Sequence, residues 1–174
     1  MKRSRLLQSF PCAATRDAGL LILGSMPGKR SLQEQQYYAH PQNIFWEIMG
    51  DLFGAGRDVN YKKRLKILNQ NGVALWDVAR QCRRPGSLDS NIRMRSVVPN
   101  DFVSLLSRAP KIKTIFFNGH KAEQLFTRLV LGKLGERAEK LRFVRLPSTS
   151  PAHASLGQNQ KKARWHRALS QKQR

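Results

Sequence analysis

Four short apolar segments of this chain each continue directly into small, polar or turn-forming residues. Together with the residues that follow them, they span residues 20–28, 73–78, 114–120 and 142–153. Each apolar stretch has the length of a buried strand, and stretches with a helical spacing of apolar residues lie between them. Strands that alternate with helices form a parallel sheet, and open sheets of this kind bind ligands beyond the carboxyl ends of their strands. The pattern therefore predicts an α/β fold whose polar segments meet in one crevice.

The spacing of apolar residues also predicts where each element lies. Strands are expected over residues 20–24, 73–76, 114–117 and 142–146. Helices are expected over residues 44–53, 61–71, 100–108, 120–131 and 159–170, with a shorter one within 132–140. Asn43 and Asn100 stand where N-caps are expected, and the polar stretches 25–41 and 77–98 are expected to be long loops. With 174 residues and no internal repeat, the chain is expected to form one domain over residues 1–174, with its core at about residues 20–170.

The chain carries a strong positive charge. Lys and Arg together number 32 against 11 acidic residues, which gives a net charge of +21. Such a field attracts nucleic acid because binding releases counterions. The charge is spread over the chain and is denser near the C-terminus, at Lys161, Lys162, Arg164, Arg167, Lys172 and Arg174. A solvated basic surface without chemistry would have the same composition, but the expected polar crevice favours an enzyme that acts on a polyanion.

The composition argues against several other classes of protein. Cys12 and Cys82 are the only cysteines, and neither lies in a CxxC pair, so a cysteine zinc site or an iron–sulfur cluster is not expected. The first residues are basic, but Gln8 and Pro11 interrupt the apolar stretch that a signal peptide needs. The chain has no apolar run long enough to cross a membrane. We expect a cytoplasmic protein without a membrane partner.

Two of the polar segments carry residues suited to binding a nucleobase. In Gly24-Ser25-Met26-Pro27-Gly28 the glycines allow the backbone to approach a ligand, although a plain turn would have the same composition. Its spacing is neither that of a Walker loop nor that of a dinucleotide fingerprint. Residues 37–46 combine aromatic rings, which stack on an extruded base, with an Asn that can hydrogen-bond a base edge or a water. Asn43 as a mere helix cap and Phe45 as a mere core residue fit the same spacing.

The last polar segment, residues 147–153, contains three consecutive hydroxyls at Ser148, Thr149 and Ser150. Hydroxyls and backbone amides in such a loop can hold phosphates, although a lone loop of this composition is more often a turn. Ser148 and His153 would be the residues of a serine hydrolase, but no GxSxG pattern supports that function.

Taken in order, these segments are specific. GSMPG, YYAHPQNIFW, WDV with RRPGSLD, FFNGH and LPSTSPAHA resemble the uracil-DNA glycosylase superfamily, and most closely its hypoxanthine-DNA (DNA-deoxyinosine) glycosylase branch. The resemblance extends from about Leu20 to Trp165. It implies a three-layer α/β/α sandwich around a four-stranded parallel sheet. In the mismatch-specific uracil glycosylases the first motif is GINPG, whose Asn positions the attacking water. Met26 stands at that position here, which argues against the usual uracil mechanism.

The resemblance implies hydrolysis of the N-glycosidic bond of deoxyinosine in DNA, which releases hypoxanthine and leaves an abasic site. The catalytic Asn of the hypoxanthine branch falls on Asn43, and the 147–153 segment takes the place of a motif that pinches phosphates and pushes a residue into the duplex. No metal or cofactor is required, and these motifs have no conspicuous Lys for strand cleavage. The expected base-binding residues are Ser25, Met26, Tyr38, Phe45 and Asn118, and the expected DNA-binding residues are Ser148, Thr149, Ser150, Ala152 and His153, with Ala152 or His153 filling the gap left by the base.

Two alternatives stay open at this point. One is a glycosylase for uracil or another deaminated base, because the superfamily changes substrate through small changes in its pocket. The other is a non-catalytic basic module that binds DNA or RNA. We expect the protein to be a monomer. The expected partner is DNA that contains a deaminated base.

Overall fold

The computed structural model describes residues 5–170 and is built on a four-stranded parallel sheet. Its strands are β2 (Leu20–Gly24), β3 (Val73–Asp77), β6 (Thr114–Asn118) and β7 (Arg142–Leu146), in the order β3-β2-β6-β7. All four predicted strands are present, and β3 and β6 each extend one residue further than predicted, to Asp77 and Asn118. These two polar residues are thereby held rigidly at the end of the sheet.

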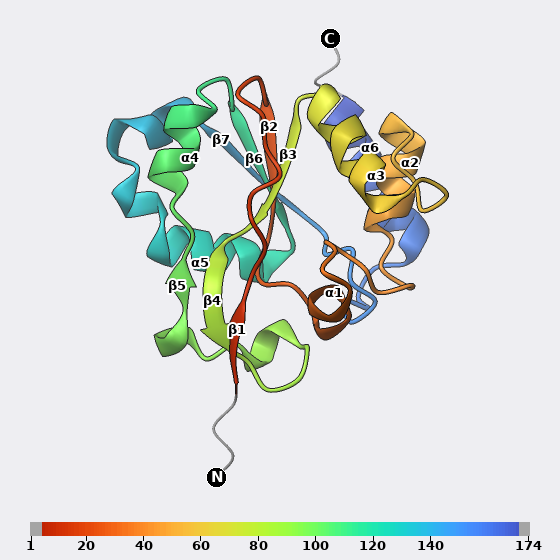
Figure 1. The fold of residues 1–174 in the computed structure, drawn as a ribbon, viewed down its shortest axis with the longest axis horizontal. Helices are drawn as coiled ribbons and strands as arrows, with labels where there is room; N and C mark the ends of the chain where they lie inside the picture. The colour runs from red at the N-terminus through yellow and green to blue at the C-terminus, as the bar shows by residue number, and fades with distance from the viewer. Residues whose placement is uncertain (1–4, 171–174) are drawn as a thin grey trace.

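Helices cover both faces of this sheet, so the molecule has the three layers expected (Figure 1). One face packs against α4 (Phe102–Arg108) and α5 (His120–Leu129), and the other against α2 (Phe45–Phe53), α3 (Tyr61–Gln70) and α6 (Gln158–Ser170). Successive strand residues alternate between the two cores: Leu21 and Leu23 belong to the first, Leu20 and Ile22 to the second. Burial on both faces explains why β2, β3 and β6 are nearly continuous apolar runs, whereas the edge strand β7 is mostly exposed.

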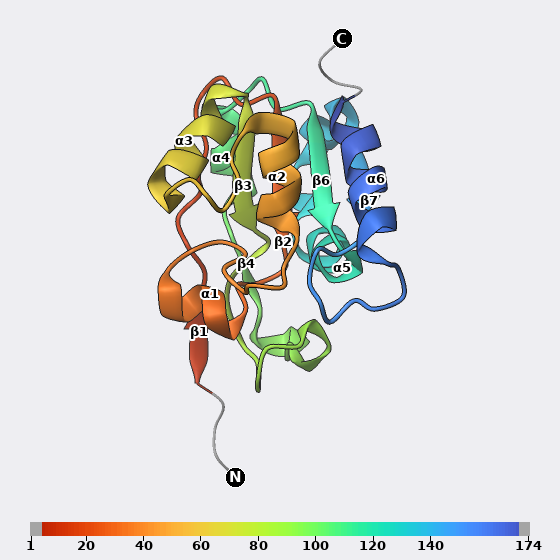
Figure 2. The same ribbon diagram turned by 90° about the vertical axis from the view of Figure 1, so that its right-hand side faces the viewer.

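The strand order creates a crevice between β2 and β6. The chain leaves β2 for β3 on one side and later returns to β6 on the other side, so loops diverge at the carboxyl end of β2. Figure 2 shows α1 (Lys29–Glu34) and the loop after β7 at this end of the sheet. The polar segments that end the four strands therefore meet where the sequence pattern places them.

The two stretches expected to be long loops contain regular structure. Residues 25–41 include α1, and residues 77–98 include β4 (Ala79–Arg83), two short 3-10 turns (Asp89–Asn91 and Met94–Ser96) and the start of β5 (Val98–Pro99). β4 pairs with β5 and with β1 (Leu6–Gln8) in a second, antiparallel sheet. The pairing of β4 with β5 shifts register between Ala79 and Gln81, which breaks the two-residue alternation that identifies a strand in sequence.

The predicted caps are partly corrected. Asn43 does accept a hydrogen bond from the backbone N–H of Phe45 (3.0 Å), although α2 begins one residue later than predicted and Ile44 takes the N-cap position. The prediction for Asn100 is wrong: Asp101 caps α4 by accepting from Ser104 N–H (3.0 Å). Asn100 instead donates to the backbone oxygen of Asp77 (2.8 Å) and thus supports the end of β3.

The remaining C-terminal elements agree with the pattern. Residues 131–140 form two 3-10 helices, Leu131–Lys133 and Gly135–Lys140, and α6 begins one residue before the predicted start. Between residues 5 and 170 no helix is both long and apolar enough to cross a membrane. Lys172 and Arg174 of the predicted basic C-terminal end lie outside the described residues.

Candidate active site

A cavity of about 250 Å3 opens at the carboxyl ends of β2, β3 and β6. Its size is below the range of roughly 300–1,000 Å3 usual for ligand pockets, which suits one nucleobase better than a larger ligand. The structure brings nine of the predicted site residues to its lining: Ser25, Met26, Tyr38, Asn43, Asn118, Ser148, Thr149, Ser150 and Ala152. Phe45 and His153 do not line it.

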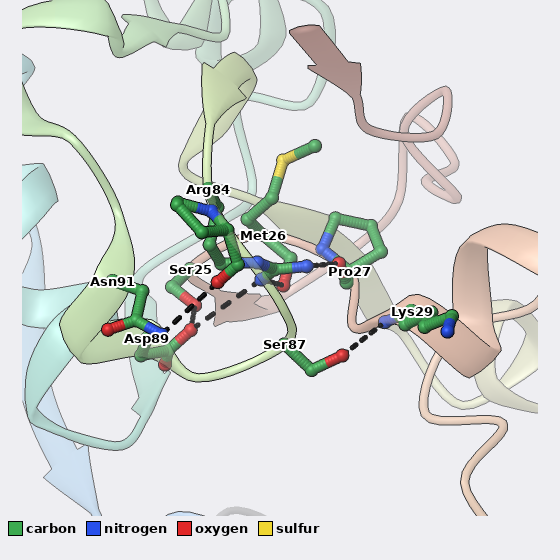
Figure 3. A network of polar contacts seen from close by, with 9 residues as sticks. Ser25, Met26, Pro27, Lys29, Arg84, Ser87, Asp89 and Asn91 are labelled. Carbon is green, nitrogen blue, oxygen red and sulfur yellow. Dashed lines mark hydrogen bonds and ion pairs between the residues drawn. The ribbon is translucent and has the colours of Figure 1, made fainter. Parts of the chain in front are cut away.

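The loop after β2 is held from outside by the segment that follows β4. The guanidinium of Arg84, 4% exposed, donates to the backbone oxygens of Met26 (3.3 Å) and Pro27 (2.6 Å), as Figure 3 shows. Ser25 Oγ donates to Asp89 Oδ1 (2.7 Å) in the same network. The side chain of Met26 belongs to the hydrophobic core between the sheet and α4–α5. Hydrogen bonds therefore fix the 24–28 segment along one side of the cavity, and Met26 contributes mainly backbone groups to the cavity lining.

Asp77, which the sequence did not single out, is a buried acid at the base of the cavity. Its side chain is 3% exposed, and its Oδ2 has no hydrogen-bond partner. Burial, reinforced by the negative charge of Asp89 and opposed by Arg84, raises the pKa of Asp77 from 3.8 to about 8. At neutral pH this carboxyl is therefore mostly protonated and has a proton to donate to a ligand.

Gly24 makes room for this carboxyl. A Cβ atom at Gly24 would lie 2.6 Å from Asp77 Oδ1 and 3.2 Å from the Tyr38 hydroxyl, closer than side chains tolerate. The Tyr38 hydroxyl is also buried without a hydrogen-bond partner, and burial raises the pKa of this phenol, so it too stays neutral. Two neutral, unpaired polar groups thus meet at the end of β2, which is the arrangement expected of a site awaiting a polar ligand.

The aromatic wall of the cavity is made by Tyr38, with Phe45 behind it. The two rings stack with centroids 4.0 Å apart and an angle of 28° between their planes. Phe45 is completely buried and contacts Trp46 and Trp165 through its edges. Tyr38 adopts a left-handed backbone conformation (φ 53°), which is rare for a non-glycine residue and brings its ring to the cavity. Phe45 can therefore support a stacking platform but has no free face for a base.

Asn43 is fixed at the mouth of the cavity. Its Oδ1 accepts from Phe45 N–H, while the structure shows no hydrogen bond from its Nδ2. The backbone around it is held by Arg57, whose Nη2 donates to the carbonyl oxygens of Tyr38 (3.2 Å), His40 (2.7 Å) and Asn43 (3.1 Å). The amide therefore keeps one free lone pair on Oδ1 and its N–H groups for a substrate or a water.

Asn118 anchors the hydroxyl-rich loop to the sheet. Its Nδ2 donates to Thr149 Oγ1 and its Oδ1 accepts from Thr149 N–H, both at 2.9 Å. Thr149 in turn accepts from Ile44 N–H through its backbone oxygen (3.2 Å), which ties this loop to the Asn43 segment. Asn118 thus uses most of its hydrogen-bonding groups to hold this loop, and one N–H remains for a ligand.

The other loop residues differ in their availability. Ser148 Oγ accepts from Ser150 N–H and Ser150 Oγ accepts from Ala152 N–H, both at 3.2 Å. Both hydroxyls therefore already bind the backbone of their own loop. Ala152 is exposed at the rim. His153 lies in a neighbouring cleft, where its Nε2 is 3.0 Å from Ser155 Oγ. Within residues 5–170 no three His, Cys, Asp or Glu side chains are arranged to hold a metal ion.

Comparison with known proteins agrees with this geometry. The family model of the uracil DNA glycosylase superfamily matches residues 11–171. The chain is similar to a hypoxanthine DNA glycosylase of Methanosarcina acetivorans (37% identity, covering 87% of this chain and 91% of that protein). It is also similar to a hypoxanthine DNA glycosylase of Methanosarcina barkeri (39% identity, covering 66% and 72%). A solution NMR structure of a protein from M. acetivorans, provisionally described as a uracil DNA glycosylase, superposes with a TM-score of 0.79 at 33% identity over 98% of this chain and 100% of that one.

Proposed function

This chain belongs to the uracil DNA glycosylase superfamily, and we propose that it hydrolyses the N-glycosidic bond of deoxyinosine in DNA, releasing hypoxanthine and leaving an abasic site. The observation that carries the proposal is the base-sized cavity in which the Asn43 amide and the neutral carboxyl of Asp77 are both available to a ligand. The names of its relatives point to the same substrate.

The reaction begins with extrusion of the damaged nucleotide, because the sugar carbon C1′ is inaccessible inside the duplex. The purine enters the cavity and stacks on Tyr38, with Phe45 supporting that ring from behind. Backbone groups of Ser25 and Met26, with the spare N–H of Asn118, bind the base edge. Ser148, Thr149 and Ser150 hold the backbone phosphates next to the extruded nucleotide.

Asn43 then orients a water molecule toward C1′. The free lone pair of its Oδ1 accepts a hydrogen bond from the water, and the Phe45 N–H on the other lone pair keeps the amide in place. As the bond from C1′ to the purine nitrogen breaks, its electron pair remains on the purine and the sugar becomes oxocarbenium-like. The water oxygen bonds to C1′, and the proton that the water loses ends on the purine nitrogen, so neutral hypoxanthine is released and the net reaction consumes one water.

Asp77 stabilises the departing purine. Its protonated carboxyl donates a hydrogen bond to a ring nitrogen or to the 6-oxo group, where negative charge develops. A donor aimed at developing charge in a water-poor site lowers the barrier by a few kcal/mol in enzymes of many kinds. Because residue 26 is Met, no side-chain amide stands at the position that the GINPG motif uses, and the water-positioning role passes to Asn43.

The gap in the duplex is filled from the rim of the cavity. Ala152 offers a single methyl group, and His153 faces the neighbouring cleft. Leu88, 52% exposed, lines the same rim on the opposite loop and is the larger apolar group. We assign this role to Leu88, because apolar side chains that enter a duplex stabilise the unstacked step.

The protein acts as a single domain over residues 1–174, as a monomer in the cytoplasm, without a metal or a cofactor and without strand cleavage. The expected substrate, DNA containing a deaminated base, is compatible with its net charge of +21.

A panel of labelled duplexes tests the proposed function. Each duplex contains one deoxyinosine, uracil, xanthine or ethenoadenine, and alkali cuts the abasic sites that the purified protein leaves. We expect cleavage chiefly at deoxyinosine, and no covalent enzyme–DNA adduct on borohydride treatment. Cleavage chiefly at uracil would replace the substrate, and tight binding without any cleavage would show a non-catalytic module.

A further inference from the structure

A second cleft of about 690 Å3 adjoins the base cavity and shares Ser148 with it. It is formed by the turn before α5, the end of β7, the loop that follows and one side of α6. Its lining contains no carboxylate, and its charged groups are four arginines: Arg142, Arg145, Arg164 and Arg167. Ser148 and Ser155 add hydroxyls to the same lining.

Within the described part of the chain, three of these guanidiniums have no acidic partner. Arg145 lies 3.1 Å from Glu123 and 3.0 Å from His120 Nδ1. Within residues 5–170, the side chains of Arg142, Arg164 and Arg167 form no ion pair or hydrogen bond. Arg164 and Arg167 are three residues apart on α6 and therefore lie on one face of the helix. An unpaired guanidinium in a hollow is well suited to bind phosphate oxygens.

A third cleft, which also adjoins the base cavity, is lined by more acidic than basic side chains. This cleft of about 660 Å3 is lined by residues between 41 and 58, together with Gln158, and shares Asn43 with the base cavity. It contains Glu47, Asp51 and Asp58, and its one cation, Arg57, is bound to backbone carbonyls. Lys162 and His166 of α6 pair with two of these acids, but they do not line the cleft. A polyanion that reaches the base cavity is therefore attracted on one side and not on the other.

We propose that the arginine cleft binds the phosphodiester backbone of the DNA strand that flanks the damaged nucleotide. The strand leaves the base cavity past Ser148, crosses the end of β7 and runs along the Arg164–Arg167 face of α6. The inference rests on the proposed function in one respect, namely that the nucleotide in the base cavity is part of a DNA strand. It assigns a substrate path to a surface outside the base cavity.

The salt dependence of binding tests this path. The probe is a duplex with a tetrahydrofuran abasic-site analogue, which binds as the product does and cannot be excised. The test variant is Arg164→Gln/Arg167→Gln, and the matched control is Lys62→Gln/Lys66→Gln on the exposed side of α3, which removes the same charge. Each lost phosphate contact lowers the slope of log Kd against log salt by about 0.9, so the α6 variant should lose about 2 in slope.

Raising salt from 50 to 200 mM increases Kd in both proteins, and the factor of this increase should be about ten times smaller for the α6 variant than for the wild type. The α3 variant should keep the wild-type slope. Equal losses in both variants would mean that only the general field of the protein acts, and an unchanged slope in the α6 variant would mean that no phosphate lies in the cleft. Either result overturns the proposal.

A second measurement separates this path from the proposed activity. Two duplexes place deoxyinosine near one end or near the other, so that each offers a flank on only one side. The wild type should excise the base faster from the duplex whose flank reaches the cleft, and the α6 variant should lose that preference while its rate on the other duplex is unchanged. A retained preference overturns the path but leaves the activity intact. Absence of excision from both duplexes would reject the proposed function, and the binding slopes would still decide the path.

Discussion

Asn43 is a residue whose two possible roles can be separated by experiment. Its Oδ1 caps the first N–H of α2, and the rest of its amide faces the base cavity. We expect Asn43→Ala to lower single-turnover excision of deoxyinosine at least about tenfold, because the water loses its orienting group. The loss of the cap should reduce the free energy of unfolding by about 1 kcal/mol.

The matched control is Asn60→Ala, because Asn60 Oδ1 caps α3 by accepting from Lys63 N–H (3.0 Å) and does not line the base cavity. It should destabilise the protein by a similar amount and leave excision unchanged. If both variants lose activity in proportion to their stability, Asn43 acts only as a cap. Thermal melts and single-turnover rates of the two variants, measured side by side, make that distinction.

Asp77 makes excision depend on pH. Its pKa of about 8 means that the carboxyl donates a proton below that pH and loses this ability above it. We therefore expect kcat/KM for deoxyinosine to fall as the pH rises through about 8. Asp77→Asn keeps a donor that does not ionise, so its activity should be flat over the same range. A rate that rises through pH 8 would identify an ionised Asp77 as a base instead.

The same group links stability to pH. The folded carboxyl holds its proton up to about pH 8, whereas an unfolded Asp releases it near 3.8, so the folded state binds more protons between these values. Its contribution to the free energy of unfolding is therefore fully present below about pH 3.8 and declines toward pH 8. We expect the stability difference between pH 5 and pH 8 to be smaller in Asp77→Asn, as denaturant melts at the two pH values would show.

At this scale the sequence is informative about some residues and silent about others. The placement of Asn43 and the 148–150 hydroxyls at the cavity could be predicted because they belong to a local, ordered set of motifs. Asp77 and Arg84 stand in the WDV and RRPGSLD motifs of the same set, but no role could be assigned to them because their importance arises from distant contacts: Arg84 binds the carbonyls of Met26 and Pro27, which lie 58 and 57 residues away. Nor does spacing show that Phe45 lies behind Tyr38 and out of reach of a base.

At the scale of elements, β2, β3 and β6 were predictable because burial on both faces makes them nearly continuous apolar runs, whereas the edge strand β7 is mostly exposed and shows only the short apolar pattern of RFVRL. The second sheet was not predictable, because β1 has three residues and β4 carries a register shift. This second sheet nevertheless has a functional consequence. It starts the loop of residues 83–91, which braces the 24–28 segment and presents Leu88 at the cavity rim.

Leu88→Ala tests the role of that loop as a unit. We expect excision of deoxyinosine from duplex DNA to fall roughly tenfold, because the extruded state loses the apolar group that fills the gap. Excision from single-stranded DNA should change little, since no base stack has to be kept open. Val103→Ala on α4 is the matched control, because Val103 is equally exposed (51%) and lies outside the base cavity. An equal loss on both strand forms would assign Leu88 to the base cavity itself.

At the scale of the whole molecule, charge and shape act together. The net charge of +21 accompanies a polar crevice that the strand order creates, and this crevice is where we propose that the base binds. A field of this size holds undamaged DNA and the abasic product as well as the substrate, because most of the attraction goes to phosphates and carries no base information. Release of product should therefore limit turnover at low ionic strength.

This leads to opposite salt effects on two rates of the same enzyme. One rate is measured in single turnover, with enzyme in excess over DNA but below the concentration that saturates binding. This rate should fall steadily as salt rises from 25 to 300 mM, because association weakens. With excess substrate, the steady-state rate should first rise, because the product dissociates faster, and then fall once binding becomes limiting. The charge of the crevice alone cannot produce this pattern, because the opposite salt effects arise from phosphate contacts over the whole basic surface. If both rates decline together from the lowest salt, product release is not limiting, and the excess charge of this protein must serve association alone.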